Sequence, residues 1–449
     1  MYPTTTGAQA ARGVSRLWIA IAALLLGHLL LPPIAQAQSQ SQSESQSESQ
    51  AQAQAENDDE FAPSTSPGEQ LQVSLLTFGP GSIYWERFGH NAILIRDAGT
   101  GSALAYNYGI FDFRQKNFFL NFARGYMTYR IAADPLRYDL AFYQHERRWV
   151  NEQKLALTPE QRVRLRDFLV WNASPEHANY RYDYFLSNCS TRVRDALDRT
   201  LDGAISRQLQ ARATQETYRS TAVRLIAPDR LFSMAMDLAL GPTADRPIDL
   251  WAESYVPMVL MDALNAVQVP DGKGGERPLV ETSTRLIDGS VVEPPAVAPD
   301  YRLPCLVVGV ALAALMLLLS SLRRHLAARI GFAVLALSLS LLSGIGGTIF
   351  ALIWGATEHW AGWHNLNLLL FDPLSWMLLP SVVASMRAHW QPSRFARQLS
   401  RLIALASLVA LGAYAATHLQ QDLQWISLML PLHLALSFAY SMAPRRANV

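Results

Sequence analysis

The chain has 449 residues, of which 50% are hydrophobic, and a formal net charge of +1. This length allows two or three domains. Because the net charge is close to zero, the protein has no overall electrostatic field that would attract nucleic acid or an acidic partner. Cys189 and Cys305 are the two cysteines. Because Cys305 opens an apolar run far along the chain, we expect the two thiols not to pair, and an unpaired thiol in an exported domain points to reactivity.

The N-terminus has the layout of a secretory signal. Two arginines precede the apolar run 17–31, and the small-residue sequence Ala35-Gln36-Ala37 follows it. This pattern predicts a signal peptide over residues 1–37, with a retained membrane anchor as the alternative. Residues 38–68 are rich in Gln, Ser, Glu and Ala. They bury too little apolar surface to offset the entropy of ordering, so we predict a disordered linker.

Residues 69–203 have the composition of a globular α+β domain. Alternating apolar residues and turn signals predict strands over residues 71–78, 88–95 and 102–108 and helices over 115–127 and 158–171. The helix at 158–171 has a Thr cap followed by Pro, which is typical of a helix start. Residues 204–302 are predicted to form a helical extension (225–238 and 247–267) and a Pro-rich connector to a membrane domain, with short strand-like pieces at 278–280 and 284–287.

Apolar runs dominate the rest of the chain and predict an all-α membrane domain over residues 303–443. About five runs are long enough to cross a bilayer, roughly 303–319, 330–354, 365–383, 402–416 and 425–442. Arginines follow the first, third and fifth runs, whereas the segments 355–364 and 417–424 hold no Lys or Arg. Because positive loops stay in the cytoplasm, residues 38–302 are predicted to lie outside it.

The stretch RYDYFLSNCSTRVRD, residues 181–195, holds Cys189 where an aromatic, extended run turns into a helix. Asn188 is a good N-cap for that helix. A thiol in the first turn lies beside free backbone N–H groups and the positive end of the helix dipole, which predicts a lowered pKa and a thiolate nucleophile. The same N–H groups could hold an oxyanion. A buried structural cysteine is the alternative.

His90 is the candidate partner of this thiol, because it lies on the predicted strand 88–95. A Cys–His pair is the minimum for thiol acyl transfer, with the imidazole moving the proton. The next strand could present Asn107 to the other ring nitrogen as an orienting residue, and Asp112 is the alternative. Purely structural roles for His90 and Asn107 remain open.

Further polar residues around the thiol are candidates for substrate binding, namely Asn188, Ser190, Arg192 and Tyr182. Arg192 either binds a phosphate or carboxylate or forms part of a solvated helix face. His145-Glu-Arg-Arg148 has the character of a charged surface, with contact to substrate as the alternative. In the membrane half, Asp372 precedes a Pro and either caps a broken helix or contacts substrate. The sequence has no metal-ligand spacing and no Gly-rich phosphate loop, so we expect no metal and no cofactor.

The order of these motifs, a His-bearing strand, another strand and then Asn-Cys at a helix start, resembles the circularly permuted NlpC/P60 (papain-like) superfamily and its lecithin retinol acyltransferase group. More closely, the chain is similar to the Lnb family of bacterial lipoprotein N-acyltransferases, formerly a domain of unknown function. The similar pieces are FGHNAILI, AYNYGIFDF, FFLNFARGYMTYRI, YDYFLSNCSTRVRD and TEHWAGWHNLNLLLFDPL. They cover most of residues 70–200 and extend into the membrane half.

The resemblance implies an inner-membrane enzyme with its catalytic domain in the periplasm. Cys189 would be the nucleophile and His90 the base, moving an acyl chain from a phospholipid through a thioester to the N-terminal amine of a diacylated lipoprotein. The expected partners are therefore a phospholipid, a lipoprotein and the bilayer, without nucleic acid. The alternatives are a membrane-anchored cysteine peptidase, a peptidoglycan amidase or a lipid hydrolase, and a non-catalytic envelope scaffold.

Overall fold

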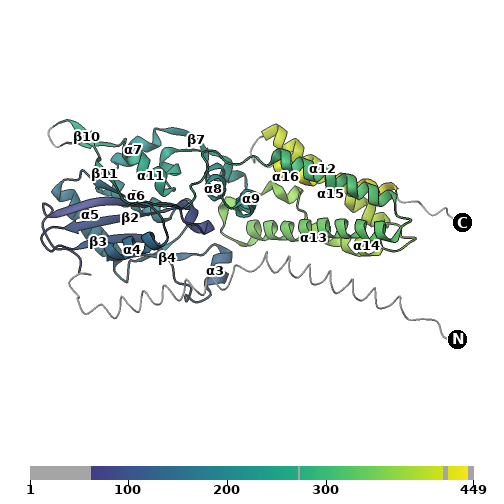
Figure 1. Ribbon diagram of the computed structural model, residues 1–449, viewed down its shortest axis with the longest axis horizontal. Helices are drawn as coiled ribbons and strands as arrows, with labels where there is room; N and C mark the ends of the chain where they lie inside the picture. Colours follow the sequence, from purple (N-terminus) through teal and green to yellow (C-terminus); the bar gives the residue numbers. More distant parts are fainter. Residues whose placement is uncertain (1–61, 272–273, 418–422, 443–449) are drawn as a thin grey trace. The chain divides into compact units, whose positions relative to one another are not determined.

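The structure is a computed structural model that describes residues 62–271, 274–417 and 423–442. The predicted signal peptide and most of the predicted linker lie outside these residues. An α+β domain comes first and a helical membrane domain follows it, as the sequence predicted (Figure 1).

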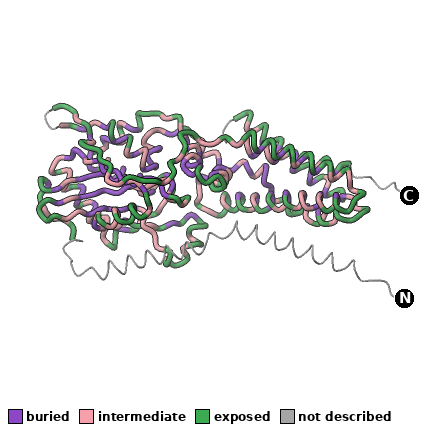
Figure 2. Tube along the Cα trace, in the orientation of Figure 1, coloured by how far each residue is buried: buried purple, intermediate pink, exposed green. Residues whose placement is uncertain are grey.

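The α+β domain is built on a seven-stranded antiparallel sheet of order β11-β5-β1-β2-β3-β4-β6. The strands are β1 (Leu71–Phe78), β2 (His90–Asp97), β3 (Ala103–Ile110), β4 (Thr128–Pro135), β5 (Val150–Leu155), β6 (Asn179–Arg181) and β11 (Val280–Ile287). Strands β1 and β2 are buried along most of their length, since both faces of the sheet are covered. Figure 2 shows this burial in the centre of the domain.

Helices α5 (Pro159–Ala173), α6 (Cys189–Thr200) and α11 (Pro257–Leu264) pack on one face of the sheet, and α4 (Leu136–His145) packs on the other. The first face holds the larger apolar cluster, in which Ile93 of β2 meets Val193 and Leu197 of α6. The second face holds a smaller cluster in which Tyr143 of α4 meets Phe78 and Leu94. Strand periodicity explains this division, because alternate residues of β2 face opposite sides.

Strand β11 comes from the segment that the sequence analysis interpreted as a connector. It pairs with β5 as the edge of the main sheet, with Val280 opposite Leu155 and Ile287 opposite Val150. Its middle residues are exposed, so it lacks the apolar alternation by which the other strands were found. The aromatic run after β6 was predicted to be extended, but it is a turn in which Asp183 accepts hydrogen bonds from the N–H groups of Phe185 and Leu186.

Smaller elements complete the α+β domain. They are η2 (Tyr84–Phe88), α3 (Phe118–Arg124), α7 (Ala204–Gln210), β7 (Ala213–Thr217), α8 (Tyr218–Ile226), α9 (Arg230–Ala239), η3 (Pro242–Asp245), β8 (Pro247–Asp249), α10 (Leu250–Glu253), β9 (Gln268–Pro270) and β10 (Glu276–Pro278). Helix α3 is shorter than the helix predicted over 115–127.

Within the described residues, five segments are long and apolar enough to cross a membrane. They are α12 (Arg302–Ser321), α13 (Leu326–Ala356), the segment Leu366–Ala384, α15 (Arg394–Thr417) and α16 (Leu423–Met442). The third segment is broken into η5 (Leu366–Leu369), η6 (Pro373–Leu378) and α14 (Leu379–Ala384). At the break, Asp372 accepts a hydrogen bond of 2.7 Å from the N–H of Leu374, so this residue is a cap rather than an open polar group.

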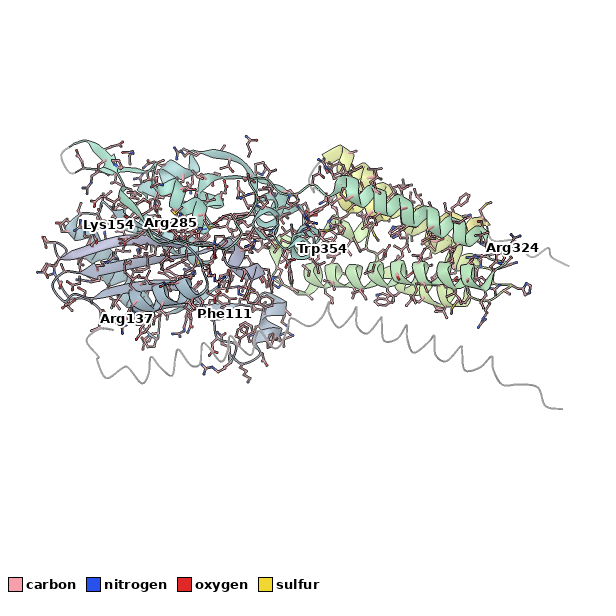
Figure 3. All side chains as sticks on the ribbon, viewed as in Figure 1. Phe111, Arg137, Lys154, Arg285, Arg324 and Trp354 are labelled. Carbon is pink, nitrogen blue, oxygen red and sulfur yellow. The ribbon has the colours of Figure 1, made fainter. Side chains whose placement is uncertain are left out.

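The two ends of the membrane domain differ in what they contact, in agreement with the predicted orientation. At one end, the N–H of Glu358 in the loop after α13 donates to the carbonyl of Arg124 in the α+β domain at 2.8 Å. At the other end, the guanidinium of Arg323 lies over the rings of Phe332 and Trp390. Figure 3 labels Trp354 and Arg324 at these opposite ends.

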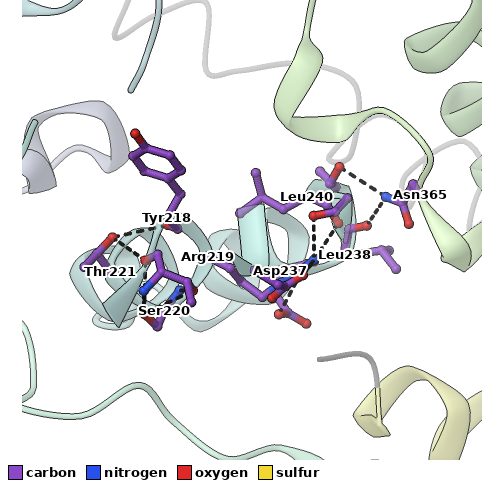
Figure 4. A network of polar contacts seen from close by, with 12 residues as sticks. Tyr218, Arg219, Ser220, Thr221, Asp237, Leu238, Leu240 and Asn365 are labelled. Atoms are coloured by element: carbon purple, nitrogen blue, oxygen red, sulfur yellow. Dashed lines mark hydrogen bonds and ion pairs between the residues drawn. The ribbon is translucent and has the colours of Figure 1, made fainter. Parts of the chain in front are cut away.

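A buried polar network joins α8 and α9 to the membrane domain (Figure 4). Arg219 of α8 binds Asp245 at 2.8 Å and Asp237 of α9 at 3.2 Å. The other carboxylate oxygen of Asp237 accepts a 2.7 Å hydrogen bond from the indole N–H of Trp425 in α16. Asn365, before the third span, donates to the carbonyl of Leu238 at 2.9 Å.

Replacing Asp237→Asn is expected to lower the free energy of unfolding by about 1–3 kcal/mol, because it removes one charged partner of the buried Arg219 and an acceptor of Trp425. The midpoint of thermal unfolding in detergent measures this loss. The control is Asp202→Asn, whose ion pair with Arg164 is exposed, so it is worth at most about 1 kcal/mol. Equal shifts for the two variants would contradict the assigned role of the network.

Candidate active site

Cys189 is the first residue of α6, and its helix start is strongly specified. The side chain of Asn188 accepts a 2.9 Å hydrogen bond from the N–H of Thr191, while the hydroxyl of Thr191 accepts from the N–H of Asn188 at 2.8 Å. This reciprocal capping box fixes the first turn of the helix. A Cβ at Gly109 of β3 would lie 3.5 Å from the Cβ of Cys189. The thiol therefore lies next to the C-terminal end of β3, far from the turn that joins β2 to β3.

Burial controls the ionisation of the thiol. It raises the pKa of Cys189 above its usual value, whereas the N–H groups of Asn91 and Ser190 and the charge of Arg148 act in the opposite direction. The N–H groups expected from the sequence are therefore present, but the prediction of a lowered pKa was wrong, because desolvation of the charged form is the larger effect. The resting sulfur is a neutral thiol.

His90 opens β2 and its imidazole is hydrogen-bonded to Asn107 of β3. The Nε2 atom of His90 lies 2.9 Å from Oδ1 of Asn107, and Nδ2 of Asn107 donates to Oδ2 of Asp139 at 3.0 Å. The amide nitrogen of Asn107 thus faces Asp139 and its oxygen, which only accepts, faces His90. This pattern assigns the proton of His90 to Nε2 and leaves the lone pair of Nδ1 free.

The strand register explains why these residues meet. Asn107 lies directly opposite Ala92, and His90 is two residues from Ala92 on the same face of β2. Diagonal neighbours across an antiparallel pair are within reach of long side chains. Asp139 was not found from the sequence, because it lies in a helix on the covering layer, and nothing in the spacing connects a helical carboxylate with a particular strand residue.

The site holds a neutral imidazole and a carboxyl group of raised pKa. Burial lowers the pKa of His90 to about 4, and the hydrogen bond that His90 donates to Asn107 only partly opposes this shift. Burial raises the pKa of Asp139 to about 7, opposed by its hydrogen bond with Asn107 and increased by the nearby charge of Asp134. At neutral pH the imidazole is therefore able to accept a proton.

Arg148 is a second residue that the sequence analysis did not assign to the site. Its motif looked like a charged surface, yet the side chain is only 4% exposed. The guanidinium donates to the carbonyl of Gly79 at 2.8 Å and lies over the ring of Tyr143. Tyr143 stacks on Phe78, which stacks on His90 with ring centroids 5.6 Å apart. A fixed positive charge is thus buried near both the thiol and the imidazole.

The remaining candidates have other partners. Asp112 forms an exposed ion pair with Arg114 at 3.2 Å, and the ring nitrogen of His90 that it was considered for is bonded to Asn107 instead. The side chain of Asn188 donates to the carbonyl of Tyr255 at 2.9 Å, in addition to capping α6.

Three more candidates border the thiol or the strands beside it. The hydroxyl of Ser190 donates to a carbonyl at 2.7 Å, so only its backbone N–H faces the sulfur. Arg192 lies over the ring of Tyr180. Tyr182 stacks on Tyr129 with centroids 4.2 Å apart, and its phenol is close enough to Cys189 for their charges to interact.

No three side chains of His, Cys, Asp or Glu gather as a possible metal site anywhere in the described part of the chain. The groups near the start of α6 are suited to proton transfer by His90 and nucleophilic attack by Cys189, with backbone N–H groups available for an anion.

Two family models match the sequence, in the same order as the two domains. The model of the Lnb N-terminal periplasmic domain matches residues 57–226, and the model of the Lnb transmembrane domain matches residues 300–445. The chain belongs to the Lnb family. It is a multi-pass membrane protein with an N-terminal periplasmic domain, and its family suggests an enzyme similar to lipoprotein N-acyltransferases. No curated protein matches it, and no solved structure does.

Alkylation of Cys189 by iodoacetamide is expected to accelerate about tenfold per pH unit through neutral pH, because only the thiolate reacts and its pKa is raised. The midpoint should lie above the ordinary thiol value of about 8.5. A Cys305→Ser chain retains Cys189 as its only cysteine and allows the rate to be measured by mass spectrometry. A Cys189→Ser chain is the blank. A rate that is already constant at neutral pH would instead indicate a thiolate–imidazolium pair.

Proposed function

We propose that this Lnb-family protein is a thiol acyltransferase of the bacterial inner membrane. It moves an acyl chain from a phospholipid to the N-terminal amine of a diacylated lipoprotein through a thioester on Cys189. The observation that carries the proposal is the thiol at the capped start of α6, beside the strand whose His90 is bonded to Asn107. The Lnb membrane domain supports lipid as the donor.

In the first half-reaction, the sulfur of Cys189 attacks the carbonyl carbon of a phospholipid ester as Nδ1 of His90 takes the thiol proton. The carbonyl oxygen becomes an oxyanion, which the N–H groups of Cys189 and Ser190 are available to stabilise. The C–O bond of the ester then breaks, and His90 returns the proton to the leaving oxygen. A lysophospholipid departs and the acyl group remains as a thioester.

In the second half-reaction, the lipoprotein amine attacks the thioester carbonyl while His90 takes a proton from the nitrogen. The C–N bond forms, the C–S bond breaks, and the proton passes to the sulfur. The cycle ends with an amide and the starting thiol, so no external oxidant or reductant is required. This is a ping-pong sequence of the kind that covalent catalysis produces.

The ionisation of the site suits this sequence. Because burial raises the pKa of Cys189 and lowers that of His90, the thiol proton must move during attack rather than before it. Such a step requires the correct ring nitrogen to face the sulfur. Asn107 and Asp139 are proposed to hold His90 in that tautomer, and the charge of Arg148 favours the thiolate that develops.

Complementation of a bacterium that is depleted of its own lipoprotein N-acyltransferase tests the proposal. Mass spectrometry of a reporter lipoprotein is expected to find a triacylated N-terminus with the wild type and a diacylated one with Cys189→Ser. His90→Ala is expected to lower the rate by about 10²–10⁴-fold, the usual contribution of an acid–base group.

The matched controls are Cys305→Ser and His145→Ala, which change the other cysteine and an exposed histidine, and both should retain triacylation. A diacylated reporter with well-expressed wild type would contradict the acceptor. Release of free fatty acid in that case would favour a lipid hydrolase, in which water takes the place of the amine.

A further inference from the structure

The segment from Phe113 to Tyr126 carries an unusual amount of exposed aromatic surface. It contains α3, a helix without a buried residue. Phe119 is 74% exposed, and the other large exposed residues are Phe113, Leu120, Phe122 and Tyr126. We call this set the α3 surface. An exposed apolar patch of this kind on a periplasmic domain marks a contact with another molecule or with a membrane.

The α3 surface is attached to the loop between the second and third spans. The Nε2 of His359 lies 3.0 Å from the carbonyl of Phe122 and donates to it, and the hydroxyl of Tyr126 bonds to Glu358 at 3.2 Å. This loop begins where α13 ends at Ala356. The α3 surface therefore lies at the level where apolar spans leave the bilayer on the periplasmic side. In Figure 1, α3 is on the side of its domain that is nearest to α13.

Basic side chains surround these rings. Residues 111–126 include Arg114, Lys116 and Arg124, which are exposed, against the single acid Asp112. Aromatic side chains are favoured at the headgroup level of a membrane, and basic ones are attracted to anionic phospholipids. The composition of the segment thus matches an interfacial element that lies in the plane of the membrane surface.

We propose that the α3 surface inserts into the periplasmic leaflet of the bilayer that the five spans cross. Its partner is a lipid surface, because the α3 surface is continuous with a loop between two lipid-facing spans. The exposed rings are joined by hydrogen bonds to a loop between two spans, and those spans present their own exposed apolar side chains, such as Ile349 and Leu352 of α13, to the lipid. The α3 surface contacts this loop at His359, whose ring lies against Phe122 with centroids 6.4 Å apart.

A row of rings connects the α3 surface with the thiol. Phe118 of α3 contacts Phe111 at 6.2 Å between centroids, Phe111 contacts Tyr129 at 5.2 Å, and Tyr129 stacks on Tyr182 beside Cys189. Insertion would bring phospholipid to the outer end of this row. This last step rests on the proposed acyltransferase function, whereas insertion itself does not.

Depth-dependent fluorescence quenching tests the insertion. The full chain, with Cys189→Ser and Cys305→Ser, receives a single new cysteine by Phe119→Cys, which is labelled with the fluorophore NBD. The protein is reconstituted into vesicles of phosphatidylethanolamine and phosphatidylglycerol. The control label is attached by Trp171→Cys on α5, where the native side chain is 52% exposed and the helix covers the sheet.

The label at position 119 is expected to emit at shorter wavelength and to lose most of its fluorescence when nitroxide-labelled phospholipid is added, while aqueous iodide has little effect. The label at position 171 should respond to iodide and not to the lipid nitroxide. Equal iodide quenching at both positions would overturn the proposal. Protection from iodide without lipid quenching would also overturn it, because it would indicate a protein contact. Because the labelled variant lacks Cys189, none of these outcomes depends on the proposed acyl transfer.

Discussion

The start of α6 is the constraint on which the rest of the site depends. Asn188 and Thr191 satisfy each other's backbone groups, so the first turn of the helix has one arrangement, and the side chain of Asn188 also anchors it to the carbonyl of Tyr255. The antiparallel register of β2 and β3 then determines which residues surround that turn. Ala92 opposite Asn107 brings His90 within reach of the amide, and Gly109 lies next to Cys189. Capping and register together bring the groups of the site to the same end of the central strands β2 and β3.

Burial then determines the chemistry of those groups. A helix N-terminus in contact with solvent lowers the pKa of a thiol, but here desolvation raises the pKa of Cys189 and lowers that of His90. The bonds from Asp139 through Asn107 to His90 orient the imidazole and define its tautomer, as the proposed role of His90 as a base requires. The buried Arg148 offsets part of the cost of forming a thiolate.

Much of the site could be predicted from local sequence. Short-range patterns predicted the cap at Asn188, the strands that carry His90 and Asn107, and the apolar spans. Tertiary structure did not override these patterns. Asp139 and Arg148 could not be predicted, because a buried charge on a covering element looks the same in sequence as an exposed one. Strand β11 was indicated only by the short strand-like pieces at its two ends, since an edge strand with an exposed middle has no continuous apolar alternation. The direction of the thiol pKa shift depends on burial, which the sequence does not reveal.

The membrane domain holds the α+β domain at the membrane surface, where the proposed reaction would take place. Asp237 binds Trp425, and Glu358 binds the backbone of Arg124, so the α+β domain is attached to the periplasmic ends of the spans through both a buried and an exposed contact. A thiol catalyst held against the bilayer meets its ester at high effective concentration. Proximity of this kind can supply much of the barrier reduction for acyl transfer, on the order of 7–11 kcal/mol at best.

Acylation of Cys189 is the step on which the proposed reaction depends, and mass spectrometry of the peptide that contains Cys189 tests it most directly. The purified chain is incubated with phospholipid in the absence of an amine acceptor and then digested under acidic conditions that preserve thioesters. We expect one acyl group on the peptide that contains Cys189, its removal by hydroxylamine, and no adduct in Cys189→Ser. An active chain whose Cys189 peptide never carries an acyl group, or an adduct that persists in Cys189→Ser, would contradict the account.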